Sequence, residues 1–150
     1  ADHTGGLPVV PSQTHLYYGK RERTLLSRLL CGNHFAGKSS IHLLDMHTGK
    51  ALSPFSRVVD VFGDGTLWAV STPGHSRDHL AYLINTTPTP ILIVGDAELT
   101  TWAMQDEILV STVDGARGKQ EVQRSATMIR TFHATYPHVQ IWFSHDEDHL

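Results

Sequence analysis

Short apolar runs separated by turn residues dominate the middle of the chain and predict a β-sheet. We expect strands where hydrophobic residues are continuous or alternate, and connections at the Gly, Pro and Asp clusters between them. Gly63-Asp64-Gly65 is typical of a tight hairpin connection. The predicted strands are residues 14–18, 57–62, 66–70, 80–84, 91–94 and 139–143.

Two segments place apolar side chains at helical spacing. Residues 20–30 repeat leucine in this way, and residues 120–136 form the best helical stripe of the chain. Pro137 ends the second helix. The stripe of this helix consists of Val122, Ala126, Ile129 and Phe132 or His133.

Three other segments show no clear period. We expect residues 33–55 to form a long loop with little regular structure, and residues 113–119 to form a polar loop. Residues 98–110 are mixed, and Trp102 and Met104 within them are expected to pack against the core. The 150 residues amount to one ordinary domain.

Composition excludes several functional classes. The net charge is -3, and basic residues do not cluster beyond Lys20-Arg21-Glu22-Arg23, so we expect no nucleic-acid partner. The single cysteine, Cys31, allows neither an internal disulfide nor a four-cysteine zinc site. No apolar run is long enough for a membrane span, so no membrane partner is expected. Oligomeric state and compartment stay open, with the cytoplasm favoured.

Eleven histidines are the unusual feature of the composition. They outnumber a plausible set of buried structural histidines, so some are expected to bind metal or to transfer protons. His15, His34, His42 and His47 crowd the first half of the chain. Those in the long loop are candidates to line a substrate entrance. The alternative is that they are ordinary polar residues that face solvent.

Three predicted strands lead directly into a potential metal ligand. The strands that end near residues 70, 94 and 143 are followed by His75, Asp96 and His145. Ligands at the ends of strands on one rim of a sheet can converge on one point. Imidazole and carboxylate together suit zinc, iron or manganese. The pattern therefore predicts a metal site at the rim of the sheet.

Four short motifs follow one another in a fixed order. They are Asp2-His3-Thr4-Gly5-Gly6, Thr72-Pro73-Gly74-His75-Ser76, Gly95-Asp96-Ala97 and Ser144-His145-Asp146. With them the chain resembles the metallo-β-lactamase fold superfamily of metal-dependent hydrolases. Their counterparts are the end of H-x-H-x-D-H, then T-P-G-H-[ST], G-D-A and G-H-D. The resemblance spans the whole chain and implies an α/β fold, an αββα sandwich with a dinuclear metal site at its edge.

The resemblance also implies a role for each candidate ligand. His75 would belong to the first metal, Asp96 would bridge both, and Asp2, His3 and His145 would bind the second. Asp2 would in addition carry a proton to the leaving group, its alternative role being a helix N-cap. The implied cofactors are two divalent metal ions, zinc with iron or manganese as alternatives. A hydroxide that bridges them would attack a carbonyl or phosphoryl centre.

One part of the first family motif does not occur in the sequence. The two histidines of H-x-H would precede Ala1. We therefore expect residues 1–150 to be a single, N-terminally incomplete domain that lacks the first strands of the family fold. A sheet that lacks strands leaves an unpaired edge and apolar surface, so the chain alone is expected to be poorly soluble or partly folded.

The bridging position narrows the expected activity. Zinc β-lactamases that hydrolyse antibiotics carry Cys or Ser there, so Asp96 argues against that activity. We expect a hydrolase of a small-molecule ester, lactone or thioester. The motif context is most similar to lactonase-type and general hydrolase members, although homoserine lactonases often place a Tyr where this chain reads Glu98-Leu99-Thr100. A phosphodiesterase of the same fold and a metal-binding but inactive fragment are the alternatives.

Neighbours of the motifs have structural interpretations. His79 is expected to hydrogen-bond backbone near the site, with an extra metal ligand as the alternative. Asp146 is expected to orient His145. Arg77 and Asp78 are expected to form a surface ion pair.

Overall fold

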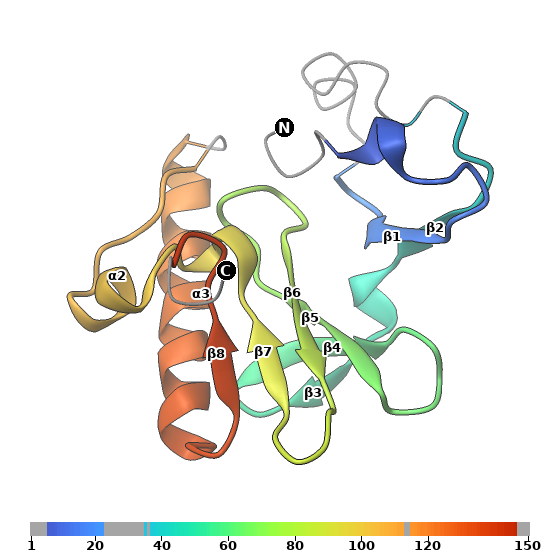
Figure 1. Ribbon diagram of the computed structural model, residues 1–150. Helices are drawn as coiled ribbons and strands as arrows, with labels where there is room; N and C mark the ends of the chain where they lie inside the picture. The colour runs from blue at the N-terminus through green and yellow to red at the C-terminus, as the bar shows by residue number, and fades with distance from the viewer. Residues whose placement is uncertain (1–5, 23–34, 36, 113–114, 147–150) are drawn as a thin grey trace.

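The computed structural model describes residues 6–22, 35, 37–112 and 115–146 (Figure 1). The expected ligands Asp2 and His3 lie outside the described residues, as does most of the helix predicted over residues 20–30. The candidate ligands His75, Asp96 and His145 all lie within them.

A six-stranded sheet forms the centre of the structure (Figure 1). Its neighbouring strands are antiparallel, except for the last pair, which is parallel. The strands predicted from residue 57 onwards are confirmed, with their ends shifted by a residue or two. In spatial order the sheet contains β3 (Lys50–Leu52), β4 (Phe55–Asp60), β5 (Leu67–Ser71), β6 (Leu80–Ile84), β7 (Ile91–Ile93) and β8 (Gln140–Trp142).

The long helix α3 (Gly115–Thr135) lies between β7 and β8 in the chain and covers one face of the sheet (Figure 1). Such a crossover is what allows β7 and β8 to run parallel. The predicted stripe is confirmed, because Val122, Ala126, Ile129 and Phe132 are buried. His133 is exposed. The loop predicted over residues 113–119 is wrong from Gly115 onwards, because the first helical turns carry glycine and charged residues that show no apolar period.

Alternation along the strands gives the sheet two apolar faces. Val58, Val70 and Ala81 point to the α3 side, where they pack with Leu92 and Phe132. On the other side Leu44, Met46 and Ala69 form a smaller cluster, which Val59, Leu80 and Tyr82 join. Burial raises the pKa of the Tyr82 phenol on this second face. The α3 side holds the larger core and therefore supplies more of the hydrophobic stabilisation.

The segment predicted as a long loop contains regular structure, so that prediction is wrong. β1 (Leu16–Gly19) pairs in parallel with β2 (Ile41–Leu44), and η3 (Met46–Thr48) and β3 follow. β1 itself confirms the strand predicted near residues 14–18. β2 obtains its hydrogen bonds from a strand far earlier in the chain, and no local pattern records such a pairing. A further short helix, η2 (Leu7–Val9), precedes β1.

Two short helices follow β7. They are η4 (Gly95–Ala97) and α2 (Thr101–Gln105). Met104 packs against the main core as predicted, whereas Trp102 is 64% exposed and that prediction is wrong. In a helix of five residues the two side chains point to different sides, and only one side faces the core. None of the described helices has the length and apolar character needed to cross a membrane.

An ion pair between a buried carboxyl group and a partly buried guanidinium joins the segment after η4 to α3. The Arg130 guanidinium donates to Glu98 Oε1 at 2.9 Å and to the carbonyl of Met104 at 3.1 Å. The Glu98 side chain is fully buried, and its Oε2 has no hydrogen-bond partner among the described residues. Burial raises the pKa of Glu98, and the opposing effect of Arg130 does not cancel the rise. Arg130 therefore compensates a carboxyl group that is costly to bury.

We expect Arg130→Met to lower the free energy of unfolding by about 3 kcal/mol, because it leaves the buried Glu98 carboxyl without its ion-pair partner. Urea denaturation measures this loss. Arg117→Met is the matched control, since Arg117 pairs with Glu121 on the exposed face of the same helix. The control should cost at most about 0.5 kcal/mol. Equal losses in the two variants would contradict a special role for the pair of Glu98 and Arg130.

Candidate metal centre

Asp96 is placed by a sharp turn at the end of β7. The turn begins at Gly95, whose φ of 55° is in the region that only glycine adopts freely. A Cβ atom at this position would also meet His79 Nε2 at 3.0 Å. The turn leaves the Asp96 side chain only 7% exposed, at the rim of the sheet. Gly95 is therefore needed for two reasons: it adopts the φ that the turn requires, and it leaves room for the ring of His79.

His75 reaches this carboxylate from the loop between β5 and β6. Its Nε2 lies 3.4 Å from Asp96 Oδ2. On the other side of the ring, Nδ1 is 3.2 Å from the carbonyl oxygen of Ser111, to which it can only donate. This contact favours the tautomer with a proton on Nδ1, so that the Nε2 lone pair faces the carboxylate.

His145 reaches the other oxygen of the same carboxylate. It follows β8, and its Nε2 lies 3.2 Å from Asp96 Oδ1. The backbone N–H of His145 donates to the carbonyl of Leu99 at 3.2 Å, which ties the last turn to the segment after η4. The three strand ends that the sequence analysis singled out therefore converge.

Each Asp96 oxygen faces a different imidazole, so the carboxylate is shared by two half-sites. With the tautomer favoured for His75, two lone-pair atoms face each other, and a proton or a cation between them removes the repulsion. A donor set of carboxylate and imidazole suits borderline divalent cations. Within the described residues, no three or more His, Cys, Asp or Glu side chains already form a complete metal-holding group. Each half-site therefore needs further donors, which the described part of the chain does not supply.

His79 supports Asp96 through the backbone, as the sequence analysis predicted. The backbone N–H of Asp96 donates to His79 Nε2 at 3.1 Å. A neutral ring that accepts at Nε2 carries its proton on Nδ1, which lies 2.9 Å from Thr72 Oγ1. Thr72 is fully buried. The chain from Thr72 through His79 to Asp96 therefore fixes both the imidazole and the turn that carries the carboxylate.

The loop that carries His75 is packed against α3. Gly74 has a φ of 144°, and a Cβ there would lie 2.4 Å from the backbone nitrogen of Val122. The hydroxyl of Ser125, also on α3, donates to the carbonyl of Pro73 at 2.7 Å. The Pro-Gly pair is thus needed for contact with a helix, and not only to form the turn.

Residues after β1 hold the far side of the same loop. Glu22 Oε1 accepts from the hydroxyl of Ser76 and from the backbone N–H of Asp78, both at 2.7 Å. Asp78 Oδ2 in turn accepts from the backbone N–H of Arg21 at 2.8 Å. Asp78 is buried, so its predicted role in a surface ion pair is wrong. Sequence reasoning missed Glu22, because it sits in a charged run that is typical of a solvent-exposed helix face.

Asp146 has a different role from the predicted one. Its carboxylate accepts from the backbone N–H of Thr101 at 3.0 and 3.1 Å and from the Thr101 hydroxyl. It therefore caps the start of α2, and the expectation that it orients His145 directly is wrong. His145 is positioned instead by the backbone of its turn.

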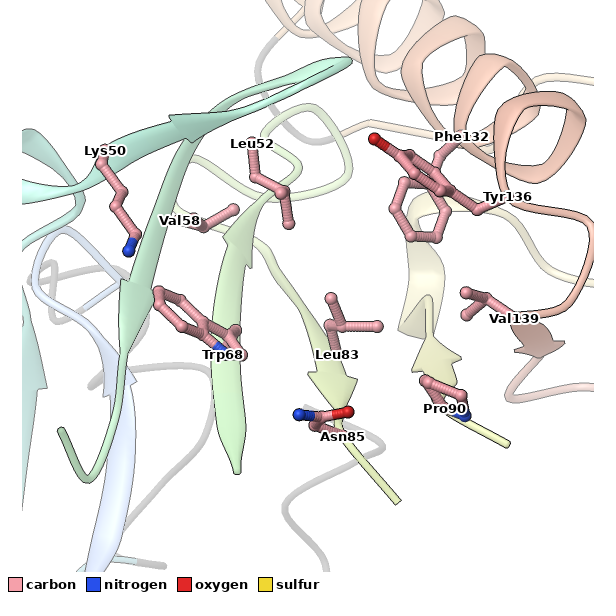
Figure 2. Close-up of a pocket in the computed structure, with 10 residues that line it drawn as sticks. All are labelled: Lys50, Leu52, Val58, Trp68, Leu83, Asn85, Pro90, Phe132, Tyr136 and Val139. Atoms are coloured by element: carbon pink, nitrogen blue, oxygen red, sulfur yellow. The ribbon is translucent and has the colours of Figure 1, made fainter. Parts of the chain in front are cut away.

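An apolar cavity of about 330 Å³ lies at the other end of the sheet (Figure 2). Leu83 and Asn85 line it where β6 ends, which is remote from His79 at the start of that strand. Phe132 and Tyr136, at the end of α3, form the opposite wall. The cavity is therefore separate from the Asp96 cluster and takes no part in it.

The chain is similar in sequence to curated lactonases. An N-acyl homoserine lactonase AttM from Azorhizobium caulinodans is 31% identical over 134 residues, and one from Agrobacterium fabrum is 29% identical over 134 residues. Each match includes 83% of this chain and 49% of the relative. The chain thus spans about half the length of these relatives. No protein-family model matches it.

Solved structures show the same arrangement of elements. One is an N-acyl homoserine lactone hydrolase with the product N-hexanoyl-L-homoserine bound at its catalytic metal centre. It matches with a TM-score of 0.65 at 18% identity, over 92% of this chain and 49% of that one. A probable metal-dependent hydrolase from Staphylococcus aureus matches with a TM-score of 0.55 at 15% identity, over 87% and 44% of the two chains. At these identities the matches establish the fold.

We expect His79→Leu to speed the hydrogen exchange of the Asp96 amide and to lower the free energy of unfolding by about 1–3 kcal/mol, because it removes the acceptor of a buried N–H. Amide exchange by NMR and urea denaturation measure the two effects. His79→Gln is the control, since its side-chain oxygen can still accept. If the Leu and Gln variants exchange the Asp96 amide at the parent rate, His79 does not hold this turn.

Proposed function

Because the chain has the fold of the metallo-β-lactamase superfamily, we propose that it is part of a metal-dependent hydrolase that opens lactones. The proposal rests on one observation above all, the nearly buried Asp96 carboxylate with an imidazole at each oxygen. A carboxylate placed in this way can bridge two cations, with His75 on one side and His145 on the other.

The imidazole and carboxylate donors around Asp96 have the chemistry for two divalent cations, zinc by preference and iron or manganese as alternatives, once further ligands complete each half-site. When bound, such cations polarise a substrate carbonyl and lower the pKa of a water molecule enough to make it a nucleophile. Asp96 would be shared by the two half-sites, and the carbonyl of Ser111 holds the ring of His75. Asp2 and His3, outside the described residues, are proposed as further ligands beside His145. Asp2 is also the proposed donor of a proton to the leaving alkoxide.

The choice of substrate class is supported by the relatives. The relatives are N-acyl homoserine lactonases, and one solved neighbour holds the product N-hexanoyl-L-homoserine at its catalytic metal centre. Lactone opening needs attack on a carbonyl carbon and protonation of an alkoxide, which the proposed site supplies. We therefore propose a small-molecule lactone as substrate and N-acyl homoserine lactones as the first class to test. Ester and thioester hydrolysis involve the same chemistry.

We expect His75→Ala to abolish lactone turnover in the natural-length protein, because one half-site loses its imidazole. Turnover is followed as the proton release that accompanies ring opening. His133→Ala is the control, since His133 is an exposed histidine of α3, and it should keep parental activity. Turnover of phosphodiesters but not of lactones would overturn the proposed substrate class. Metal binding without any turnover would support an inactive metal-binding domain instead.

We expect Asp96→Asn to release more metal than either His75→Ala or His145→Ala, because both half-sites share this carboxylate. Elemental analysis of the purified variants gives the number of ions retained. Each histidine variant should lose mainly the ion on its own side. If Asp96→Asn retained as much metal as the parent, the bridging role of Asp96 would be refuted.

A further inference from the structure

A second cluster of histidines lies on the small β1–β2 pair, which lies to one side of the main sheet (Figure 1). The parallel register places Tyr17 opposite His42, and the backbone bond from Leu16 N to Ser40 O extends the pairing by one step. His15 and Tyr17 therefore share a face with Ser40 and His42, because side chains two apart point the same way. Both histidines are exposed, so ions and water can reach them.

Three polar atoms of this cluster lie within hydrogen-bond distance of one another. His15 Nδ1 is 2.9 Å from His42 Nε2, and Ser40 Oγ is 2.9 Å from the first and 3.0 Å from the second. Neutral rings and one hydroxyl have too few protons to make all three contacts hydrogen bonds. At least one of the three contacts therefore has no proton of its own, and a cation bound between the two nitrogens would replace that contact.

The rings are held in place by stacking. His42 lies between two rings, with centroid distances of 4.6 Å to Tyr17 and 5.1 Å to His15 and interplanar angles of 15° and 22°. Tyr17 is itself braced by an edge-on contact with Phe62. The nitrogens are therefore fixed before any ligand arrives, which lowers the entropic cost of binding one.

We propose that His15 Nδ1 and His42 Nε2 form a peripheral binding site for a borderline divalent cation such as Zn²⁺, Ni²⁺ or Cu²⁺, independent of the proposed catalytic centre. Zn–N bonds of about 2.0–2.1 Å at a tetrahedral angle need nitrogens about 3.3 Å apart. The observed spacing of 2.9 Å would have to open slightly to admit the ion. Water completes the coordination, and imidazole ligands select these cations over Mg²⁺ and Ca²⁺.

The site would link two segments that are distant in the sequence. His15 precedes β1 and His42 lies in β2, so an ion bound to both fastens the two strands to each other. A ligand that binds only the folded form stabilises it in proportion to the logarithm of its concentration. Occupancy should therefore raise the melting temperature of the protein.

The test is a titration of the untagged natural-length protein with Ni²⁺, followed by calorimetry. The parent should show one class of binding that persists in Asp96→Asn, where the proposed catalytic centre is impaired. His15→Ala and His42→Ala, made in that background, should each weaken this binding at least tenfold. His138→Ala, which removes another exposed histidine, is the matched control and should leave it unchanged. Circular dichroism verifies that each variant is folded.

Chemical modification gives a second readout. Diethyl pyrocarbonate modifies accessible imidazoles, and mass spectrometry locates the modified residues. Ni²⁺ should protect His15 and His42 in the Asp96→Asn variant while His138 reacts as before. Ser40→Ala should retain the protection, because the hydroxyl is not a required ligand. Equal modification with and without Ni²⁺, or Ni²⁺ binding that survives both His→Ala changes, would overturn the proposal.

Discussion

The carboxylate of Asp96 must stay nearly buried between two imidazoles, and much of the structure follows from that constraint. A buried carboxylate is costly unless charges or hydrogen bonds compensate it. Here His75 and His145 approach its two oxygens, while His79 binds its backbone N–H. The β5–β6 connection and the turn after β8 supply these rings, while Asp96 follows β7, so the order of strands in the sheet is what brings them together.

Two glycines make the required distances attainable. Gly95 turns the chain so that Asp96 points back over the sheet rim, in a conformation that other residues avoid. Gly74 lets the His75 loop rest directly on the backbone of α3 at Val122. The helix is therefore part of the site although it carries no ligand. The ion pair of Glu98 and Arg130 fastens the same helix to the segment that follows Asp96.

The prediction from the sequence was good where the signal is local. Apolar runs located the strands of the main sheet, and the stripe from Val122 to Phe132 located α3. The motif residues His75, Asp96 and His145 were identified correctly as neighbours, since each follows a strand. His79 was correctly interpreted as a support of the backbone. Two of the errors involve contacts with distant segments: β2 pairs with β1, and the buried Asp78 hydrogen-bonds with Arg21 and Glu22.

The sequence by itself determined the kind of chemistry, because imidazole, carboxylate and glycine occur in motifs whose residue types and order limit what they can bind. Only the tertiary structure decided the geometry. It assigned one oxygen of Asp96 to each histidine, made Ser111 the partner of His75, and placed His15 beside His42. These are contacts between residues far apart in the chain, which are set by strand order and helix packing and leave no periodic trace in the sequence.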